Sequence, residues 1–168
     1  MTMAMKTFIV LNVLLILLIC LNVTAMAQDG LQTHAYSPVL VYDPNRDAAQ
    51  DLRDAEAEAK RTGKNVLVEV GGNWCIWCLI MYKFFARHPK ISDLRDKNFV
   101  TIAINFSREN ENKEVLSQFP QIPAYPHLFV LNGNGELLRS QRARDLEERD
   151  SYDTREVERF LKRWSPKR

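Results

Sequence analysis

The chain has 168 residues, of which 46% are hydrophobic, and it carries 23 Lys and Arg against 21 Asp and Glu. This length suits one domain with a core of its own. Because the charges nearly balance, the chain has no general attraction for nucleic acid or for an anionic membrane surface, and we expect neither as a partner.

Residues 1–27 have the pattern of a secretory signal peptide. Lys6 precedes an apolar run at residues 8–21, which only Asn12 interrupts, and an Ala-x-Ala cleavage site follows at residues 25–27. The run is shorter than the ~20 apolar residues that span a bilayer. We therefore expect export, most simply to the periplasm, with no stable membrane anchor after cleavage. An uncleaved anchor is the alternative.

The rest of the chain is expected to form one domain at residues 47–168. It follows an extended lead-in at residues 28–46, in which residues 39–42 form a candidate edge strand. We find no internal repeat and no low-complexity linker that would divide the domain.

The domain is predicted to begin with a helix and a buried strand. Good helix formers fill residues 48–61, with Asp47 as the N-cap and Gly63 as the stop. Residues 65–70 are rich in β-branched side chains and are apolar on both faces apart from Glu69. We therefore expect this strand in the centre of the sheet.

The middle of the chain alternates between helical and strand patterns. Residues 75–87 are apolar almost all round and predict a buried helix, which the His-Pro pair at 88–89 ends. A short helical piece is expected at 91–97, a second buried strand at 99–106, and a mostly exposed helix at 109–119.

The last third predicts a hairpin and a helix. The expected elements are a strand at 127–131, a tight turn at 132–135, a return strand at 136–141, a charged loop at 142–150, and a helix capped by Asp153 or Thr154. The apolar stripe of that helix is Val157, Phe160, Leu161 and Trp164. The order predicts an α/β fold, with a mixed sheet that starts parallel, ends in an antiparallel hairpin and has helices on both faces.

The cysteines point to redox chemistry. Cys20 leaves with the signal peptide, so Cys75 and Cys78 are the thiols of the mature chain. A disulfide across three positions closes almost no loop and stabilises little, so we interpret the pair as reactive. Cys75 at a helix N-terminus is the expected nucleophile, and Cys78, one turn later, is the expected resolving thiol. The Cys75–Cys78 disulfide is expected to open and close in use.

A metal-binding or interaction module is the alternative role of this pair. Zinc or copper held between Cys75 and Cys78 would need two further ligands. His34, His88 and His127 show no paired spacing. We therefore expect neither a metal nor an organic cofactor.

Two tryptophans flank the thiols. Trp77 is expected to be exposed in the first helical turn, where it would contact an apolar part of a substrate. Trp74 has two equal interpretations, as a second substrate contact or as a residue that packs on the helix.

From residue 47 to residue 164 the chain resembles the thioredoxin-like superfamily, and especially exported bacterial thioredoxin-like proteins. The resemblance is carried by the motif at 74–78 between a buried strand and a helix, by Tyr125-Pro126-His127 before the next strand, and by the hairpin at 132–135. It implies a thioredoxin fold and a thiol:disulfide oxidoreductase that acts on protein or peptide disulfides. It also implies a redox partner, for which a membrane reductase is one choice.

The resemblance also implies individual roles. Glu69 matches a buried acid that takes or gives the proton of Cys78, although an acid at a strand edge could instead reach solvent. Pro126 matches a cis-proline that faces the cysteines, and Tyr125 would offer its backbone to an extended substrate. Pro120 and Pro123 are rival prolines, and a trans-proline opening an edge strand is the plainer alternative.

The chain departs from the family pattern in two ways. The residues between the cysteines are Ile76 and Trp77, where thioredoxin has Gly-Pro, and both are placed among the substrate contacts. The strand at 101–106 has no clear counterpart of the family's buried lysine. The direction of electron flow stays open for these reasons, and we favour reduction or exchange over net oxidation.

Overall fold

A computed structural model describes residues 42–167 of the chain. The expected signal peptide and residues 39–41 of the candidate edge strand lie outside this part, and Tyr42 is not in a strand. The elements are α2 (Ala48–Thr62), β1 (Asn65–Gly71), α3 (Ile76–Arg87), α4 (Pro89–Asn98), β2 (Phe99–Asn105), α5 (Lys113–Leu116), β3 (His127–Leu131), β4 (Leu137–Arg142), η1 (Ala143–Leu146), β5 (Glu147–Glu148), β6 (Ser151–Tyr152) and α6 (Thr154–Trp164).

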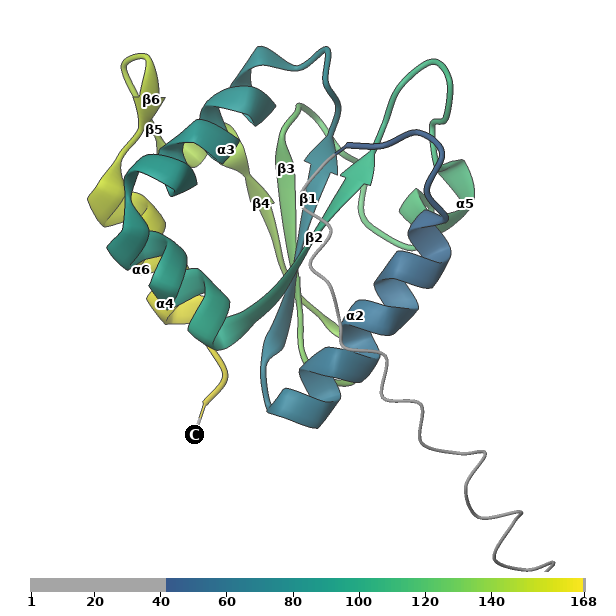
Figure 1. Cartoon of the computed structure of the whole chain (residues 1–168), viewed down its shortest axis with the longest axis horizontal. Helices are drawn as coiled ribbons and strands as arrows, with labels where there is room; N and C mark the ends of the chain where they lie inside the picture. The colour runs from purple at the N-terminus through teal and green to yellow at the C-terminus, as the bar shows by residue number, and fades with distance from the viewer. Residues whose placement is uncertain (1–41, 168) are drawn as a thin grey trace, which may run out of the picture. The chain divides into compact units, whose positions relative to one another are not determined.

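A four-stranded mixed sheet of order β2-β1-β3-β4 forms the middle layer (Figure 1). Strand β1 pairs in parallel with β2 and antiparallel with β3, and β3 pairs antiparallel with β4. The expected fold class and the central position of β1 are confirmed. The parallel pair needs a long crossover, which α3 and α4 supply.

The sheet is buried on both faces, each with its own apolar core. Helices α2 and α5 lie on one side of it and α3, α4 and α6 on the other (Figure 1). Because side chains alternate along a strand, Val66, Val68 and Val70 of β1 face the core under α2. Leu67 faces the second core, where it packs with residues of α3 and α6.

The helix ends follow from capping residues that the sequence predicts. The Asp47 carboxylate accepts a hydrogen bond from the backbone N–H of Gln50 at 2.9 Å, which satisfies a free donor of α2. Gly63 ends α2 at a φ of 67°, in the left-handed region that glycine adopts without steric cost. Asp153 caps α6 in the same way as Asp47 caps α2.

The helix expected at residues 109–119 is wrong for most of its length. Only α5, at Lys113–Leu116, is helical. The Asn112 side chain donates to the backbone oxygen of Asn105 at 2.6 Å, and Asn105 donates to the backbone oxygen of Asn110 at 3.0 Å. These asparagine bonds compete with the helical backbone pattern, and Asn112 adopts a φ of 48°.

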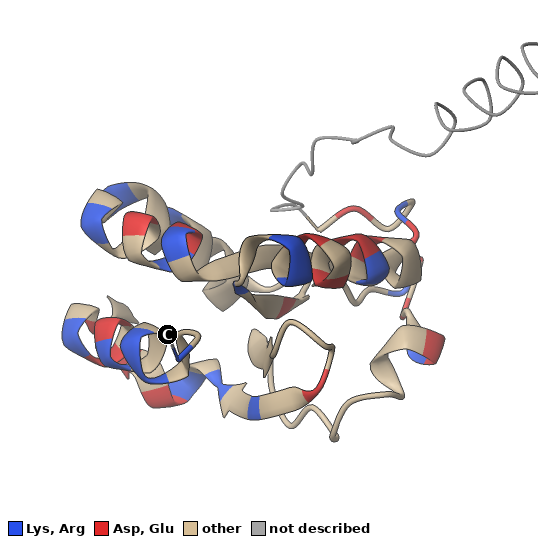
Figure 2. Cartoon of the chain, turned by 90° about the horizontal axis from the view of Figure 1, so that it is seen from below, with Lys and Arg blue, Asp and Glu red and all other residues tan. Residues whose placement is uncertain are grey.

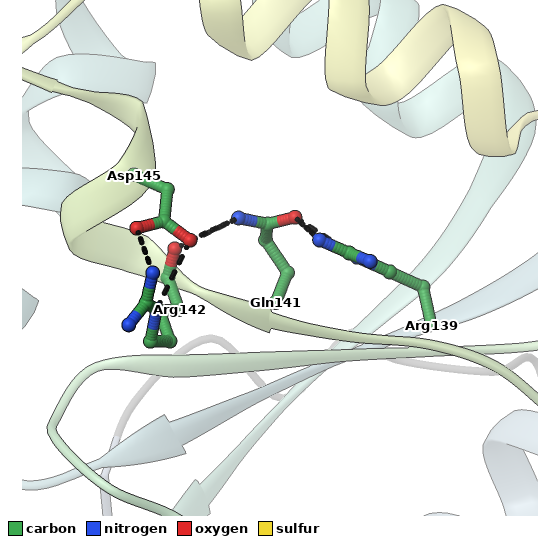
Figure 3. A network of polar contacts seen from close by, with 4 residues as sticks. All are labelled: Arg139, Gln141, Arg142 and Asp145. Carbon is green, nitrogen blue, oxygen red and sulfur yellow. Dashed lines mark hydrogen bonds and ion pairs between the residues drawn. The ribbon is translucent and has the colours of Figure 1, made fainter.

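The charged loop expected at residues 142–150 is also structured. It contains η1 and β5, and β5 pairs with β6. A polar network fixes its start: Arg139 donates to the buried Gln141 side chain at 2.9 Å, Gln141 donates to Asp145 at 3.3 Å, and Arg142 pairs with Asp145 at 2.9 Å (Figure 3). These contacts turn the chain out of β4 toward the β5–β6 hairpin.

Charges of both signs are mixed along the helices (Figure 2). Exposed pairs such as Arg61–Glu58 at 2.7 Å and Lys162–Glu158 at 2.6 Å lie one helical turn apart. Pairs of this kind contribute little to stability, so packing of the two cores holds the fold together. Within residues 42–167, none of the helices combines the length and the apolar character that a membrane crossing requires.

We predict that Phe129→Ala lowers the free energy of unfolding by about 3–5 kcal/mol. Phe129 in β3 is fully buried and stacks on Phe119 with ring centroids 4.5 Å apart, so its loss leaves a cavity in the core under α2. Urea unfolding of the oxidised protein measures the change. Leu138→Ala, at an exposed position of β4, is the control and should stay within about 0.5 kcal/mol of the wild type. Equal losses in the two variants would contradict the assignment of this core.

Candidate active site

The two cysteines lie at the N-terminus of α3 and are joined by a disulfide. Cys75 is the N-cap residue, and its sulfur accepts a hydrogen bond from the backbone N–H of Cys78 at 3.2 Å. Cys78 is 1% exposed and Cys75 is 5% exposed. The same N–H and the helix dipole favour negative charge on the Cys75 sulfur once the disulfide opens.

The end of β1 makes room for the inner sulfur. Leu67, Glu69 and Gly71 alternate onto the α3 face of the sheet. A Cβ atom on Gly71 would lie 2.4 Å from the Cys78 sulfur, closer than atoms can approach. Any other residue at position 71 would therefore push Cys78 away from the sheet.

Glu69 lies in the middle of β1, between Ala103 of β2 and Leu128 of β3. Its Oε1 atom is buried and has no hydrogen-bond partner among the described residues. Burial raises the pKa of the Glu69 carboxyl above its ordinary value of 4.5, and the positive charge of Arg95 opposes part of this rise. The carboxyl is thus not at a strand edge, and acids with a perturbed pKa are common at functional sites.

Arg95 was not singled out in the sequence. It lies on α4, is buried, and stacks on the Phe85 ring at 4.3 Å while its Nε donates to Asp96 at 2.8 Å. The positive charge that acts on Glu69 thus comes from a helix, whereas the lysine of the family pattern was expected on β2. Arg95 follows an apolar residue in a short helix, and this sequence pattern does not indicate that its side chain is buried near Glu69.

Trp74 lies at the surface and forms one wall beside the cysteines. It is 58% exposed, and its indole N–H donates to the backbone oxygen of Phe106 at 2.6 Å. Its ring meets Tyr125 edge-on at 5.5 Å, and Tyr125 stacks on Phe106 at 4.9 Å. The Tyr125–Pro126 peptide bond is cis.

The expected exposure of Trp77 is wrong. Trp77 is half-buried and packs edge-on against Tyr152 at 5.8 Å, and the Tyr152 hydroxyl donates to the Trp77 backbone oxygen at 3.2 Å. The β5–β6 hairpin, most of which lies where the sequence predicts a charged loop, covers this side of the first turn of α3.

The outer face of α3 is apolar and exposed, so the expectation of a helix buried all round is also wrong. We call the residues of this face the exposed strip: Ile76, Leu79 and Tyr82, at helical spacing. Ile76 is 63% exposed and adjoins the disulfide. On the other side of the motif, Trp74 lines a hollow of about 640 Å³ together with Pro44, Asn73 and Phe106.

A metal held by the two cysteines would need further ligands close to them. Within residues 42–167, no three side chains of His, Cys, Asp or Glu are grouped as metal ligands. The chemistry that the site presents is that of two sulfurs and one buried carboxyl.

The family described as thioredoxin-like matches residues 47–133 of the sequence. The chain belongs to this thioredoxin-like family. The thioredoxin-like domain is similar in structure to a disulphide isomerase from Xylella fastidiosa Temecula1, with a TM-score of 0.61 and 26% identity over 73% of this chain and 94% of the other. The oxidised C-terminal domain of DsbD from Neisseria meningitidis shares the fold, with a TM-score of 0.57 and 15% identity over 74% of this chain and 98% of that domain.

A longer relative is similar in sequence. The thiol:disulfide interchange protein DsbD of Pseudomonas fluorescens is 27% identical over 121 residues, which are 70% of this chain and 19% of that protein. The family and these relatives support the thiol:disulfide oxidoreductase activity that the sequence predicts for the thioredoxin-like domain.

We predict that Glu69→Gln changes how stability depends on pH. A folded-state pKa above 4.5 means that the folded protein binds more protons than the unfolded one at higher pH, so wild-type stability falls as pH rises from about 4.5 through the folded pKa. The variant lacks this loss, so the difference in unfolding free energy should move in its favour over that range.

Urea unfolding of the oxidised proteins from about pH 4 to about pH 8 measures this difference. Glu148→Gln, at an exposed position of β5, is the matched control. A difference between Glu69→Gln and the wild type that stays constant with pH would contradict a raised pKa for Glu69.

Proposed function

We propose that this protein is an exported thiol:disulfide oxidoreductase that reduces or exchanges disulfides in proteins or peptides. The observation that carries the proposal is the Cys75–Cys78 disulfide, which caps α3 directly against the central strand of a thioredoxin-like fold. Residues 1–27 would act as its signal peptide, residues 28–46 as a lead-in, and residues 47–168 as the catalytic domain.

The proposed reaction begins with the reduced pair. The Cys75 thiolate attacks one sulfur of a substrate disulfide, forms a mixed disulfide and releases the first substrate thiolate. Cys78 then gives its proton to the Glu69 carboxylate and attacks the Cys75 sulfur. The Cys75–Cys78 disulfide forms, the second substrate thiolate leaves, and two electrons have passed from the protein to the substrate.

We propose that substrates present extended, apolar segments near their disulfide. The exposed strip adjoins the disulfide on one side, and Trp74 with Tyr125 forms an aromatic wall on the other. Apolar side chains left in water around a reactive group favour contacts with apolar partners. Tyr125, before Pro126, would offer its backbone to the substrate, and Ile76 would contact the residues next to the disulfide. Trp77 would support the first turn of α3 from within.

Each cycle leaves the pair oxidised, so a second protein must reduce it. We propose a membrane reductase as this partner, because an exported domain is separated from the reductants of the cytosol. Neither a metal nor an organic cofactor is needed for the exchange.

We predict that Cys75→Ser abolishes the reduction of insulin with dithiothreitol as the electron source. Cys78→Ser should also lose turnover, but its Cys75 can still attack and should accumulate mixed disulfides that a non-reducing gel resolves. Cys20→Ser, within the proposed signal peptide, is the matched control and should keep wild-type activity. Wild-type activity in Cys75→Ser would rule out the proposed nucleophile.

We predict that the chain produced in a Gram-negative host is recovered from the periplasm with Gln28 as its first residue. Cleavage after Ala27 depends on small residues at the site, so Ala27→Arg should leave the leader attached. Osmotic-shock fractionation and intact mass measure both outcomes. Wild-type protein of full-length mass in the cytoplasmic fraction would contradict export.

A further inference from the structure

Tyr42 lies beside the cysteines, although the sequence places it 33 residues before Cys75 and outside the motif. It is 7% exposed and packs with Cys75, Cys78 and Ala103. Its backbone oxygen accepts a hydrogen bond from the Asn73 side chain at 3.0 Å. This bond ties the start of the described chain to the turn that precedes the disulfide.

The Tyr42 hydroxyl and the Cys78 sulfur both lie close to the position that a side chain on Gly71 would occupy. The position of a Cβ atom on Gly71 lies 2.4 Å from the Cys78 sulfur and 3.2 Å from the Tyr42 hydroxyl oxygen. The absence of a side chain on Gly71 thus lets both groups approach the end of β1 from one side.

The Tyr42 hydroxyl has no hydrogen-bond partner within residues 42–167 of the oxidised protein, and its oxygen is buried. Buried polar groups are nearly always paired, so an unpaired one calls for an explanation. Tyr152, a second tyrosine near the site, differs in that its hydroxyl donates to the Trp77 backbone oxygen. Tyr42 is therefore the hydroxyl that is available to a new acceptor.

Opening the disulfide creates such an acceptor. A disulfide sulfur accepts hydrogen bonds weakly, whereas a thiolate attracts donors strongly. Burial raises the pKa of Tyr42 well above its ordinary value, and the charge of Glu69 and the neighbouring Tyr152 add to this, so the hydroxyl keeps its proton near neutral pH. Glu69 on β1 and Tyr152 on β6 act electrostatically on the Tyr42 hydroxyl, and the two cysteines pack with its side chain.

We propose that Tyr42 is a positioning residue that donates a hydrogen bond to the Cys78 sulfur in the reduced protein and in the mixed disulfide. The bond would hold the resolving sulfur under Cys75 and stabilise its negative charge after Glu69 has taken the proton. The inference rests on the proposed exchange at Cys75–Cys78 and adds a donor that the reaction above does not use.

The test compares Tyr42→Phe with the wild type in glutathione redox buffers, using the full chain. After thiol trapping, mass spectrometry of the peptide that holds Cys75 and Cys78 gives the reduced fraction, so Cys20 does not enter. Losing a bond made only in the reduced state should lower the equilibrium constant for reduction by about three- to tenfold. A tenfold change corresponds to a potential about 30 mV more negative.

A second measurement separates this role from a structural one. The oxidised Tyr42→Phe protein should melt at the wild-type temperature or above, because it loses only an unpaired hydroxyl, whereas the reduced variant should melt below the reduced wild type. Tyr152→Phe is the matched control. It loses a bond already present in the oxidised state, so its equilibrium constant for reduction should stay within about twofold of the wild-type value.

Two results would overturn the proposal. One is an equilibrium constant for Tyr42→Phe within twofold of the wild type, and the other is an equal loss of thermal stability in both redox states. Neither readout needs substrate turnover. An inactive protein whose potential still responds to Tyr42→Phe would therefore refute the proposed function and leave this inference intact.

Discussion

The structure depends on one close approach, that of the Cys78 sulfur to the end of the central strand. Gly71 permits it, because a Cβ atom there would lie 2.4 Å from that sulfur. Since side chains alternate along β1, the same register that puts Gly71 under Cys78 puts Glu69 one step deeper and Leu67 in the core. A shift of the β1 register by one residue would turn the Glu69 carboxyl into the apolar core under α2 and place a valine under the sulfur. The strand register therefore sets the core and the chemistry together.

Helix α3 packs on the sheet through one face only. Its inner face buries Met81, Phe84 and Phe85, while the exposed strip stays in water. The aromatic and aliphatic contacts of the inner face hold the helix, so the apolar outer face can be kept for other molecules. Tyr152 secures the first turn from the hairpin side. The contacts that stabilise this twelve-residue helix and the contacts that we propose for substrates thus lie on its opposite faces.

Much of the fold follows from local pattern. Asp47 and Gly63 bound α2 through capping, and the apolar runs of β1 and β3 are buried on both faces, so these elements could be predicted without tertiary information. The segment at 109–119 could not, because the Asn112 side chain bonds to the backbone of Asn105, and the Asn110 side chain bonds to that of Pro44, which is distant in sequence. The burial of Trp77 could not be predicted, because the β5–β6 hairpin that covers it consists of two-residue strands, which are too short to show an alternation of apolar and polar residues. The motif located the sulfurs, but Tyr42 and Arg95 reach the site only through folding.

The residues that the sequence could not place bear on the open question of direction. Glu69 Oε1 and the Tyr42 hydroxyl are both buried and unpaired among the described residues, and we propose the reduced Cys78 sulfur as a partner for each of them. Unpaired groups that find partners on reduction favour the reduced form. Arg95 acts in the opposite sense on Glu69, because its charge favours the carboxylate, which repels a thiolate. Glu69 also acts electrostatically on Tyr42, so protonation of the carboxyl and the hydroxyl is linked. If these proposed contacts form, the redox potential depends on Glu69 and Tyr42 as well as on Ile76 and Trp77, which lie between the cysteines.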